Sequence, residues 1–243
     1  MNLNSYVSFT KLEEVKSLVC VQAHPGELDI AAGGTIRKLT QKGCKVFFLT
    51  VTDGSKGTMD ASYSPLKLME VRRQEAMDAG RALGVTEQLF FDDTDGACPP
   101  VVELCRSIMA VIRVLKPQAV LLMDPFKPYE FHPDRIAVAT AAAQAAYLSP
   151  MPHYHKDVGE PHAIDSIVFH TTNNANTFVD IEDTIEKKRE AFFLHASQTE
   201  GKEKDMEFYI DYLSRVHESA CGFKHSEAFF QLPSQLMSLQ FQV

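Results

Sequence analysis

The amino-acid sequence predicts a Rossmann-like α/β fold, in which helices cover both faces of a mostly parallel sheet. Short apolar runs, typical of buried strands, alternate with longer segments of helical periodicity over residues of about 15–150. The turns between them have lengths that suit strand–helix–strand units. Because a strand covered on both faces is apolar throughout, these continuous runs favour a parallel sheet.

Four strands are expected early in the chain, as neighbours in one sheet. They are residues 17–22, 45–51, 88–91 and 119–123. The expected helices are residues 31–41, 66–83, 101–115 and 134–147. Gly43 and Gly84 each follow a helix, where glycine is a common terminator, and Pro117 ends the third helix.

The composition changes after Ser149, where a Pro- and His-rich loop covers residues 150–161. Further strands are expected at residues 164–170 and 177–181, and helices at 182–195 and 203–217. No segment resembles a linker. We therefore expect one domain over residues 1–243, with the core sheet at about 15–150 and the C-terminal strands and helices at about 151–243.

Composition narrows the function classes. The net charge of −8 argues against nucleic-acid binding, which needs a basic face. No apolar stretch approaches the roughly 20 residues of a membrane span, and no secretory signal is visible. Cys20 and Cys44 lie in strand-like runs and are expected to be buried reduced thiols. A cytoplasmic protein with a small-molecule ligand is expected, and a homo-oligomer is left open.

Two His-Pro turns carry the chemistry. The first is Ala23-His24-Pro25-Gly26-Glu27, followed by Asp29, and the second is Phe131-His132-Pro133-Asp134-Arg135. Each follows a predicted buried strand and runs into a predicted helix. Because the carboxyl ends of parallel strands share one edge of a sheet, where ligands bind, the two turns are expected to meet.

At these residues the chain resembles the LmbE-like/PIG-L family of zinc-dependent N-deacetylases, which includes the GlcNAc-phosphatidylinositol de-N-acetylases. The family motif Ala-His-Pro-Asp-Asp-Glu…Gly-Gly-Thr compares with residues 23–35, and its Asp-Pro…Tyr…His-Pro-Asp-His segment with residues 124–135. Weaker matches are 52–54, 72–75, 95–96, 176–180, 195–198 and 226–229. The resemblance implies the fold predicted above and hydrolysis of the N-acetyl amide of an amino sugar or glycoconjugate.

The resemblance also implies roles for individual residues. His24 and Glu27 stand at metal-ligand positions, and His132 stands where a histidine stabilises the oxyanion. Two positions depart from the family. Gly26 replaces the general-base Asp, and Arg135 replaces the third ligand, although a guanidinium cannot coordinate zinc. Zinc-dependent deacetylation is therefore in doubt, and zinc is expected to be absent or weakly bound.

Three hypotheses remain open. In the favoured one, Arg135 replaces the zinc charge and pairs with Glu27 in a pocket that binds a small N-acylated ligand. In the second, an active metal-dependent deacetylase uses rearranged ligands, with His24, Glu27 or Asp29, and His132, and Asp29 is a candidate carboxylate for catalysis. In the third, the chain is a structural or regulatory subunit with a vestigial pocket.

Four further residues are candidates for binding the substrate, beside Arg135. Asp53 and Asp95 lie at predicted strand ends and could accept hydrogen bonds from sugar hydroxyls, although Asp53 could equally order its turn. Arg72 could face the substrate or lie on a solvated helix surface. Tyr129 could reach a substrate oxygen from its loop. His195, which follows a helix, is expected to be structural.

Overall fold

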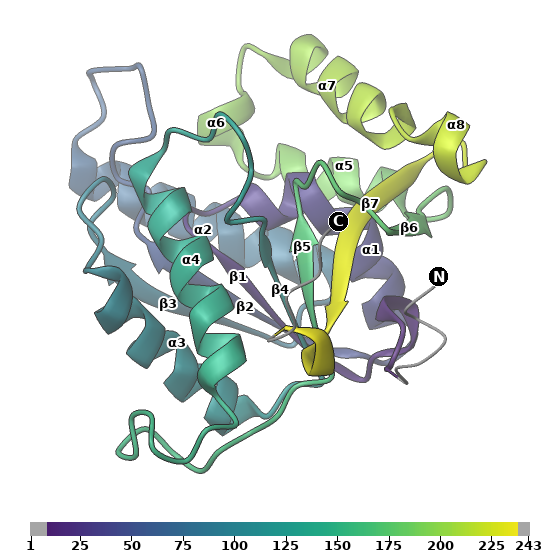
Figure 1. Cartoon of the computed structure of the whole chain (residues 1–243). Coiled ribbons are helices and arrows are strands. Elements are labelled where there is room, and N and C mark those ends of the chain that lie inside the picture. The colour runs from purple at the N-terminus through teal and green to yellow at the C-terminus, as the bar shows by residue number, and fades with distance from the viewer. Residues whose placement is uncertain (1–8, 238–243) are drawn as a thin grey trace.

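The computed structural model, which describes residues 9–237, has a single seven-stranded sheet with helices on both faces (Figure 1). The strands are β1 (Ser17–Gln22), β2 (Lys45–Thr52), β3 (Glu87–Asp93), β4 (Ala119–Met123), β5 (Ser166–His170), β6 (Thr177–Asp180) and β7 (Ser226–Pro233). Their order across the sheet is β3-β2-β1-β4-β5-β7-β6. The first five pair in parallel, whereas β7 runs antiparallel to both β5 and β6.

The helices lie between and after these strands. They are α1 (Glu27–Gln41), α2 (Pro65–Leu83), α3 (Val101–Leu115), α4 (Pro133–Leu148), α5 (Ile185–Phe193), α6 (Ala196–Thr199), α7 (Glu203–Arg215) and α8 (Glu218–Cys221). Short 3-10 turns cover Leu12–Glu14 and Ser234–Leu236. Helices α3 and α4 pack side by side on one face of the sheet, and α1, α2 and α5 cover the other (Figure 1).

The core follows from the alternation of side chains along the central strand. Leu18 and Cys20 of β1 face the cluster that contains α1, whereas Val19 and Val21 face the cluster that contains α3 and α4. Each of these side chains is at most 2% exposed. A strand that must fill both faces favours apolar side chains at successive positions, and this is why the run from Leu18 to Val21 is continuously apolar.

The expected architecture is confirmed, and its details are adjusted. The four early strands are parallel neighbours, as expected. Helix α1 begins at Glu27 and not at residue 31, because the chain turns at Gly26, whose φ of 94° favours glycine. Strand β7 was not expected, and it fills the sheet between β5 and β6. None of the described helices is long and apolar enough to span a bilayer.

The cysteines behave as expected. All five are free, and Cys20 and Cys44 are buried. Burial raises the pKa of the Cys44 thiol to about 11, so it stays protonated at neutral pH.

Candidate functional site

The two His-Pro turns meet at the carboxyl edge of the sheet, as the sequence predicts. Strands β1 and β4 are parallel neighbours, with Leu18 opposite Ala119, so the turns that follow them lie side by side. The Thr52 backbone N–H and hydroxyl both donate to the carbonyl of Ala23 at 2.8 Å, which ties the first turn to β2. The rings of His24 and His132 consequently lie edge to face, with centroids 4.4 Å apart.

A cavity of about 420 Å³ opens at this junction. From the two turns it is lined by His24, Pro25, Gly26, Glu27, His132 and Arg135. Its other walls are Ile30, Gly57, Arg72, Asp95, Phe192, His195, Gln198, Lys202 and Met206. The mixture of charged groups and apolar side chains suits a small polar ligand with an apolar part.

Glu27 joins His24 to Arg135. Glu27 Oε1 lies 2.8 Å from His24 Nδ1 and accepts a hydrogen bond from Arg135 Nε at 2.6 Å, while Oε2 accepts from the backbone N–H of Ala23 at 2.9 Å. Burial disfavours the charged carboxylate, but the hydrogen bond from His24 and the charges of His24 and Arg135 outweigh it and lower the pKa of Glu27 to about 2. The expected Arg135–Glu27 pair is confirmed.

The other nitrogen of His24 faces two more carboxylates. His24 Nε2 lies 3.2 Å from Asp95 Oδ1 and 3.3 Å from Asp134 Oδ2. Backbone N–H groups hold the carboxylates in place, from Lys56 to Asp95 at 3.0 Å and from Gly96 to Asp134 at 2.6 Å. Burial works against a charged imidazole, yet the hydrogen bonds to Asp95 and Glu27 raise the pKa of His24 to about 9. His24 is therefore an imidazolium at neutral pH.

The inherited zinc arrangement does not fit these residues. It would need lone pairs from His24, Glu27 and residue 135 on one ion, but Arg135 has donors only and one of them is bonded to Glu27. The guanidinium supplies the positive charge that the carboxylate needs.

A second set of donors suits a metal better. One donor atom from each of His24, Asp95, His132 and Asp134 lies within 4.8 Å of the others. Two imidazoles and two carboxylates are ligands that zinc accepts. Among the described residues, buried His132 Nδ1 has no hydrogen-bond partner. Binding at this set would require His24 to lose its Nε2 proton, because a histidine nitrogen binds a metal through a lone pair and so must be unprotonated.

The imidazole of His195 occupies the space beside Gly26. A Cβ atom at residue 26 would lie 3.4 Å from both Nδ1 and Cε1 of His195, so the imidazole lies against the backbone where the family carries a carboxylate. His195 Nε2 lies 3.1 Å from Asp29 Oδ2, and both side chains are at most 2% exposed. The role of His195 at the cavity was missed, since sequence spacing cannot relate residues 29 and 195.

Arg72 is buried beside the cavity and is tied to its loops. It donates from Nη1 to the carbonyl of Gly54 at 2.8 Å and from Nη2 to that of Pro25 at 3.0 Å. Arg72 therefore does not lie on the solvated surface of its helix. Arg73 does, and it pairs with half-exposed Asp92 at 2.6 Å. Arg72 thus fixes the first His-Pro turn and also lines the cavity.

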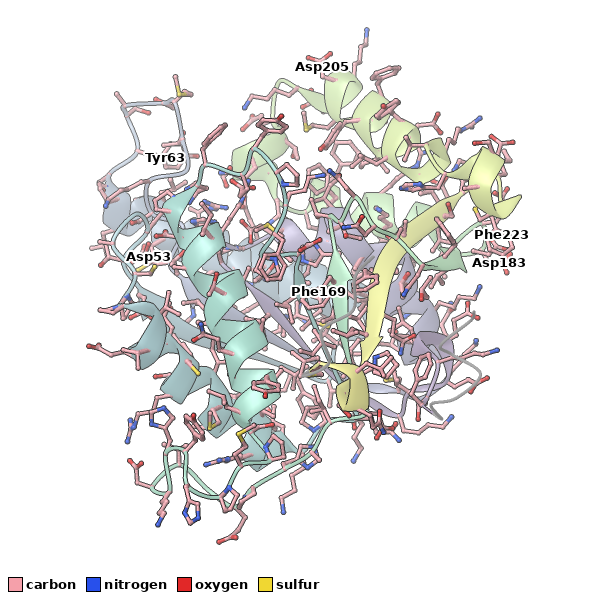
Figure 2. All side chains as sticks on the ribbon, viewed as in Figure 1. Asp53, Tyr63, Phe169, Asp183, Asp205 and Phe223 are labelled. Carbon is pink, nitrogen blue, oxygen red and sulfur yellow. The ribbon has the colours of Figure 1, made fainter. Side chains whose placement is uncertain are left out.

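Three candidate residues do not line the cavity. Asp53, labelled in Figure 2 on the loop after β2, accepts hydrogen bonds from the backbone N–H groups of Ser55 at 2.9 Å and Asp95 at 3.1 Å, so it orders its turn. Tyr129 is 88% exposed, with a φ of 63°. Asp29 contacts His195 and does not itself line the cavity. Asp134, which was not singled out, lies in the centre of the charged cluster.

Comparisons with known proteins show the family to which the chain belongs. The family model of GlcNAc-PI de-N-acetylases (PIG-L) matches residues 19–146, which contain both His-Pro turns. A diacetylchitobiose deacetylase of Thermococcus kodakarensis is 33% identical over 225 residues, which cover 90% of this chain and 84% of the relative.

Solved structures share the fold. The N,N'-diacetylchitobiose deacetylase of Pyrococcus horikoshii, in complex with an inhibitor, superposes with a TM-score of 0.91 at 26% identity, covering 98% of this chain and 91% of that chain. GalB of Pseudomonas putida, a 4-carboxy-2-hydroxymuconate hydratase, superposes with a TM-score of 0.76 at 20% identity, covering 94% and 99%. Because a hydratase shares the fold, the reaction must be argued from the residues of the site.

Proposed function

Because the chain belongs to the PIG-L family of GlcNAc-PI de-N-acetylases, we propose that its cavity binds a small N-acylated, amino-sugar-like ligand and that Arg135 stands in for the zinc ion. Hydrolysis by the inherited zinc arrangement is then lost or greatly slowed. The observation that carries this proposal is the 2.6 Å hydrogen bond between Arg135 Nε and Glu27 Oε1.

Each group in the cavity has a binding role in this proposal. The Arg135 guanidinium and the imidazole of His132 provide donors for the acyl oxygen, and Asp95 accepts hydrogen bonds from sugar hydroxyls. Arg72 holds the Pro25 carbonyl and keeps the first turn in place. Tyr129 could close over a bound ligand from its exposed loop, and Asp53 would act indirectly by holding the Asp95 backbone. We place the protein in the cytoplasm.

Metal content and ligand binding test the proposal together. Protein purified without chelator or added zinc should contain far less than one zinc per chain by elemental analysis. N-acetylglucosamine or diacetylchitobiose at 100 times its Kd should stabilise the fold by about 2.7 kcal/mol, a rise in Tm of roughly 5–10 °C. Glucosamine, which lacks the acyl group, is the control ligand. No stabilisation by any acylated sugar would favour a structural subunit with a vestigial pocket.

The second candidate is a metal-dependent deacetylase whose ion is displaced from the inherited position. The group formed by His24, Asp95, His132 and Asp134 favours it, and buried His132 Nδ1 lacks a partner in the described part of the chain. In this arrangement Glu27 would orient His24 through Nδ1, as carboxylates commonly do for ligating histidines. The ion would polarise the acyl oxygen when bound.

The two candidates are separated by substitutions with different expected effects on zinc binding. Asp95→Asn should abolish zinc binding if the displaced site is correct, whereas Glu27→Gln should only weaken it, since Glu27 is not a ligand there. Isothermal titration with zinc measures both variants. Close to one tightly held zinc in the wild type, lost in Asp95→Asn, would overturn the first proposal and establish the second.

A further inference from the structure

We infer that His195 and Asp29 form a catalytic dyad that replaces the general-base carboxylate missing at Gly26. The inference rests on the proposed binding of an N-acylated ligand in the cavity. It concerns the proton-transfer part of the reaction and is independent of whether a metal binds.

The position of the imidazole is the first argument. His195 belongs to the short segment between α5 and α6, far in sequence from the first His-Pro turn, yet it lines the cavity against the backbone of Gly26. A side chain at residue 26 would project directly at the imidazole, because its Cβ would lie 3.4 Å from Nδ1. The loss of a side chain at residue 26 is therefore matched by a ring that fills the same region.

The tautomer of His195 is the second argument. Asp29 Oδ2, which is only an acceptor when ionised, lies 3.1 Å from His195 Nε2. The proton must then reside on Nε2, which leaves Nδ1 with a lone pair. This Nδ1 is buried and has no hydrogen-bond partner among the described residues. A buried acceptor without a partner is costly, and a ligand or water bound in the cavity would remove this cost.

The proposed reaction needs only the bound amide and one water molecule. His195 Nδ1 takes a proton from water as the water oxygen bonds to the acyl carbon of the bound amide. Asp29 stabilises the resulting imidazolium through its hydrogen bond to Nε2–H. The same proton is then delivered to the amide nitrogen as the C–N bond breaks, which yields an amine and a carboxylic acid. His132 and Arg135 face the cavity from the opposite turn, where the oxyanion can be stabilised.

The test uses an activated amide, so that slow turnover can be measured. N-trifluoroacetylglucosamine is incubated with the full chain, in EDTA and separately with added zinc, and release of trifluoroacetate is followed by ¹⁹F NMR. We expect His195→Gln and Asp29→Asn to lower the rate by 10²–10⁴-fold, the usual contribution of a positioned base. The Asn amide would donate to Nε2 and force the proton onto Nδ1, leaving no acceptor.

Two controls distinguish a catalytic His195 from a histidine that only supports the structure. His225→Gln changes another buried histidine, which is bonded to Ser214 and does not line the cavity, and it should leave the rate unchanged. His195→Ala should regain activity with added imidazole, which a purely structural histidine would not permit. Binding of N-acetylglucosamine, measured by thermal shift, should be retained in every variant.

The outcomes distinguish the two proposals. Retained binding with equal rates in wild type and His195→Gln would overturn the dyad and leave the ligand-binding proposal standing. No turnover in either EDTA or zinc would likewise overturn the dyad. Absence of sugar binding in the wild type would refute the proposed function itself, whatever the rates.

Discussion

Raising the pH above neutrality should weaken the fold by removing a proton that His24 shares with the surrounding carboxylates. His24 is 6% exposed, and its pKa is raised to about 9 by hydrogen bonds to Asp95 and Glu27 that outweigh its burial. In the unfolded chain its pKa returns to about 6.5. A folded-state pKa above the unfolded value means that the stabilisation is fully present below pH 6.5 and is lost as the pH rises through 9.

The magnitude follows from the shift. From 6.5 to about 9, at 1.36 kcal/mol per pH unit, the free energy of unfolding should fall by roughly 3 kcal/mol. The same contacts lower the pKa of Glu27 and Asp95 to about 2, so that part of the stabilisation is also lost as the pH falls from about 4.5 towards 2. The pKa shifts of His24 and of the two carboxylates arise from the same interactions, so the two losses of stability refer to one free energy and do not add. Its maximum lies between about pH 4.5 and 6.5.

Urea unfolding in EDTA at pH 6 and pH 9.5 measures this effect in wild type and His24→Gln. The wild type should lose roughly 3 kcal/mol more than the variant over this interval. His170→Gln is the matched control, since burial lowers the pKa of His170 to about 4 and it stays neutral in the folded protein at both pH values. Only unfolded His170, with a pKa of about 6.5, takes up a proton near pH 6, so this variant should lose about 1 kcal/mol more than the wild type over the interval. Parallel behaviour of wild type and His24→Gln would refute the charged cluster as described.

Other predictions concern the altered positions and the buried pair beneath α1. Arg135→His should raise zinc affinity in isothermal titration by opening the inherited ligand position; unchanged affinity would contradict the assignment. Gly26→Asp combined with Arg135→His should increase zinc-dependent deacetylation by more than the product of the single effects, because ligand and base act as a unit; the strain of a φ of 94° should cost about 1–2 kcal/mol of stability. Glu227→Gln should destabilise by about 3–5 kcal/mol in urea unfolding, because it leaves Lys188, bonded to it at 2.7 Å and 1% exposed, as a buried unpaired charge. Lys188→Met should cost less, since the Glu227 carboxylate keeps its bonds from the Gly34 and Thr35 backbone N–H groups, and an equal cost would show that the charge is not the cause.

The central sheet could be predicted because local and long-range physics agree there. The run at 17–22 is apolar from Leu18 to Val21, as burial on both faces favours, and glycine or proline follows each early helix. Strand β7 could not be found in the same way. Its buried and partly exposed positions alternate, and its last residue is Pro233. Its antiparallel place between β5 and β6 depends on pairing across 46 to 67 residues of sequence.

The sequence by itself determined the family, the meeting of the two His-Pro turns, and the pairing of Arg135 with Glu27. The motifs can be read directly from the sequence. The meeting of the turns follows because neighbouring parallel strands end at one edge of the sheet. Only the tertiary structure decided that His195 fills the space at Gly26 and holds Asp29, and that Asp134 joins His24 and Asp95. The contacts of His24 with Asp95 and Asp134 span 71 and 110 residues, and that of Asp29 with His195 spans 166. The place of His195 depends on how α5 and α6 pack on α1 and α2. The sequence gives the chemical type of each residue, but the distance between two buried side chains depends on how the core packs.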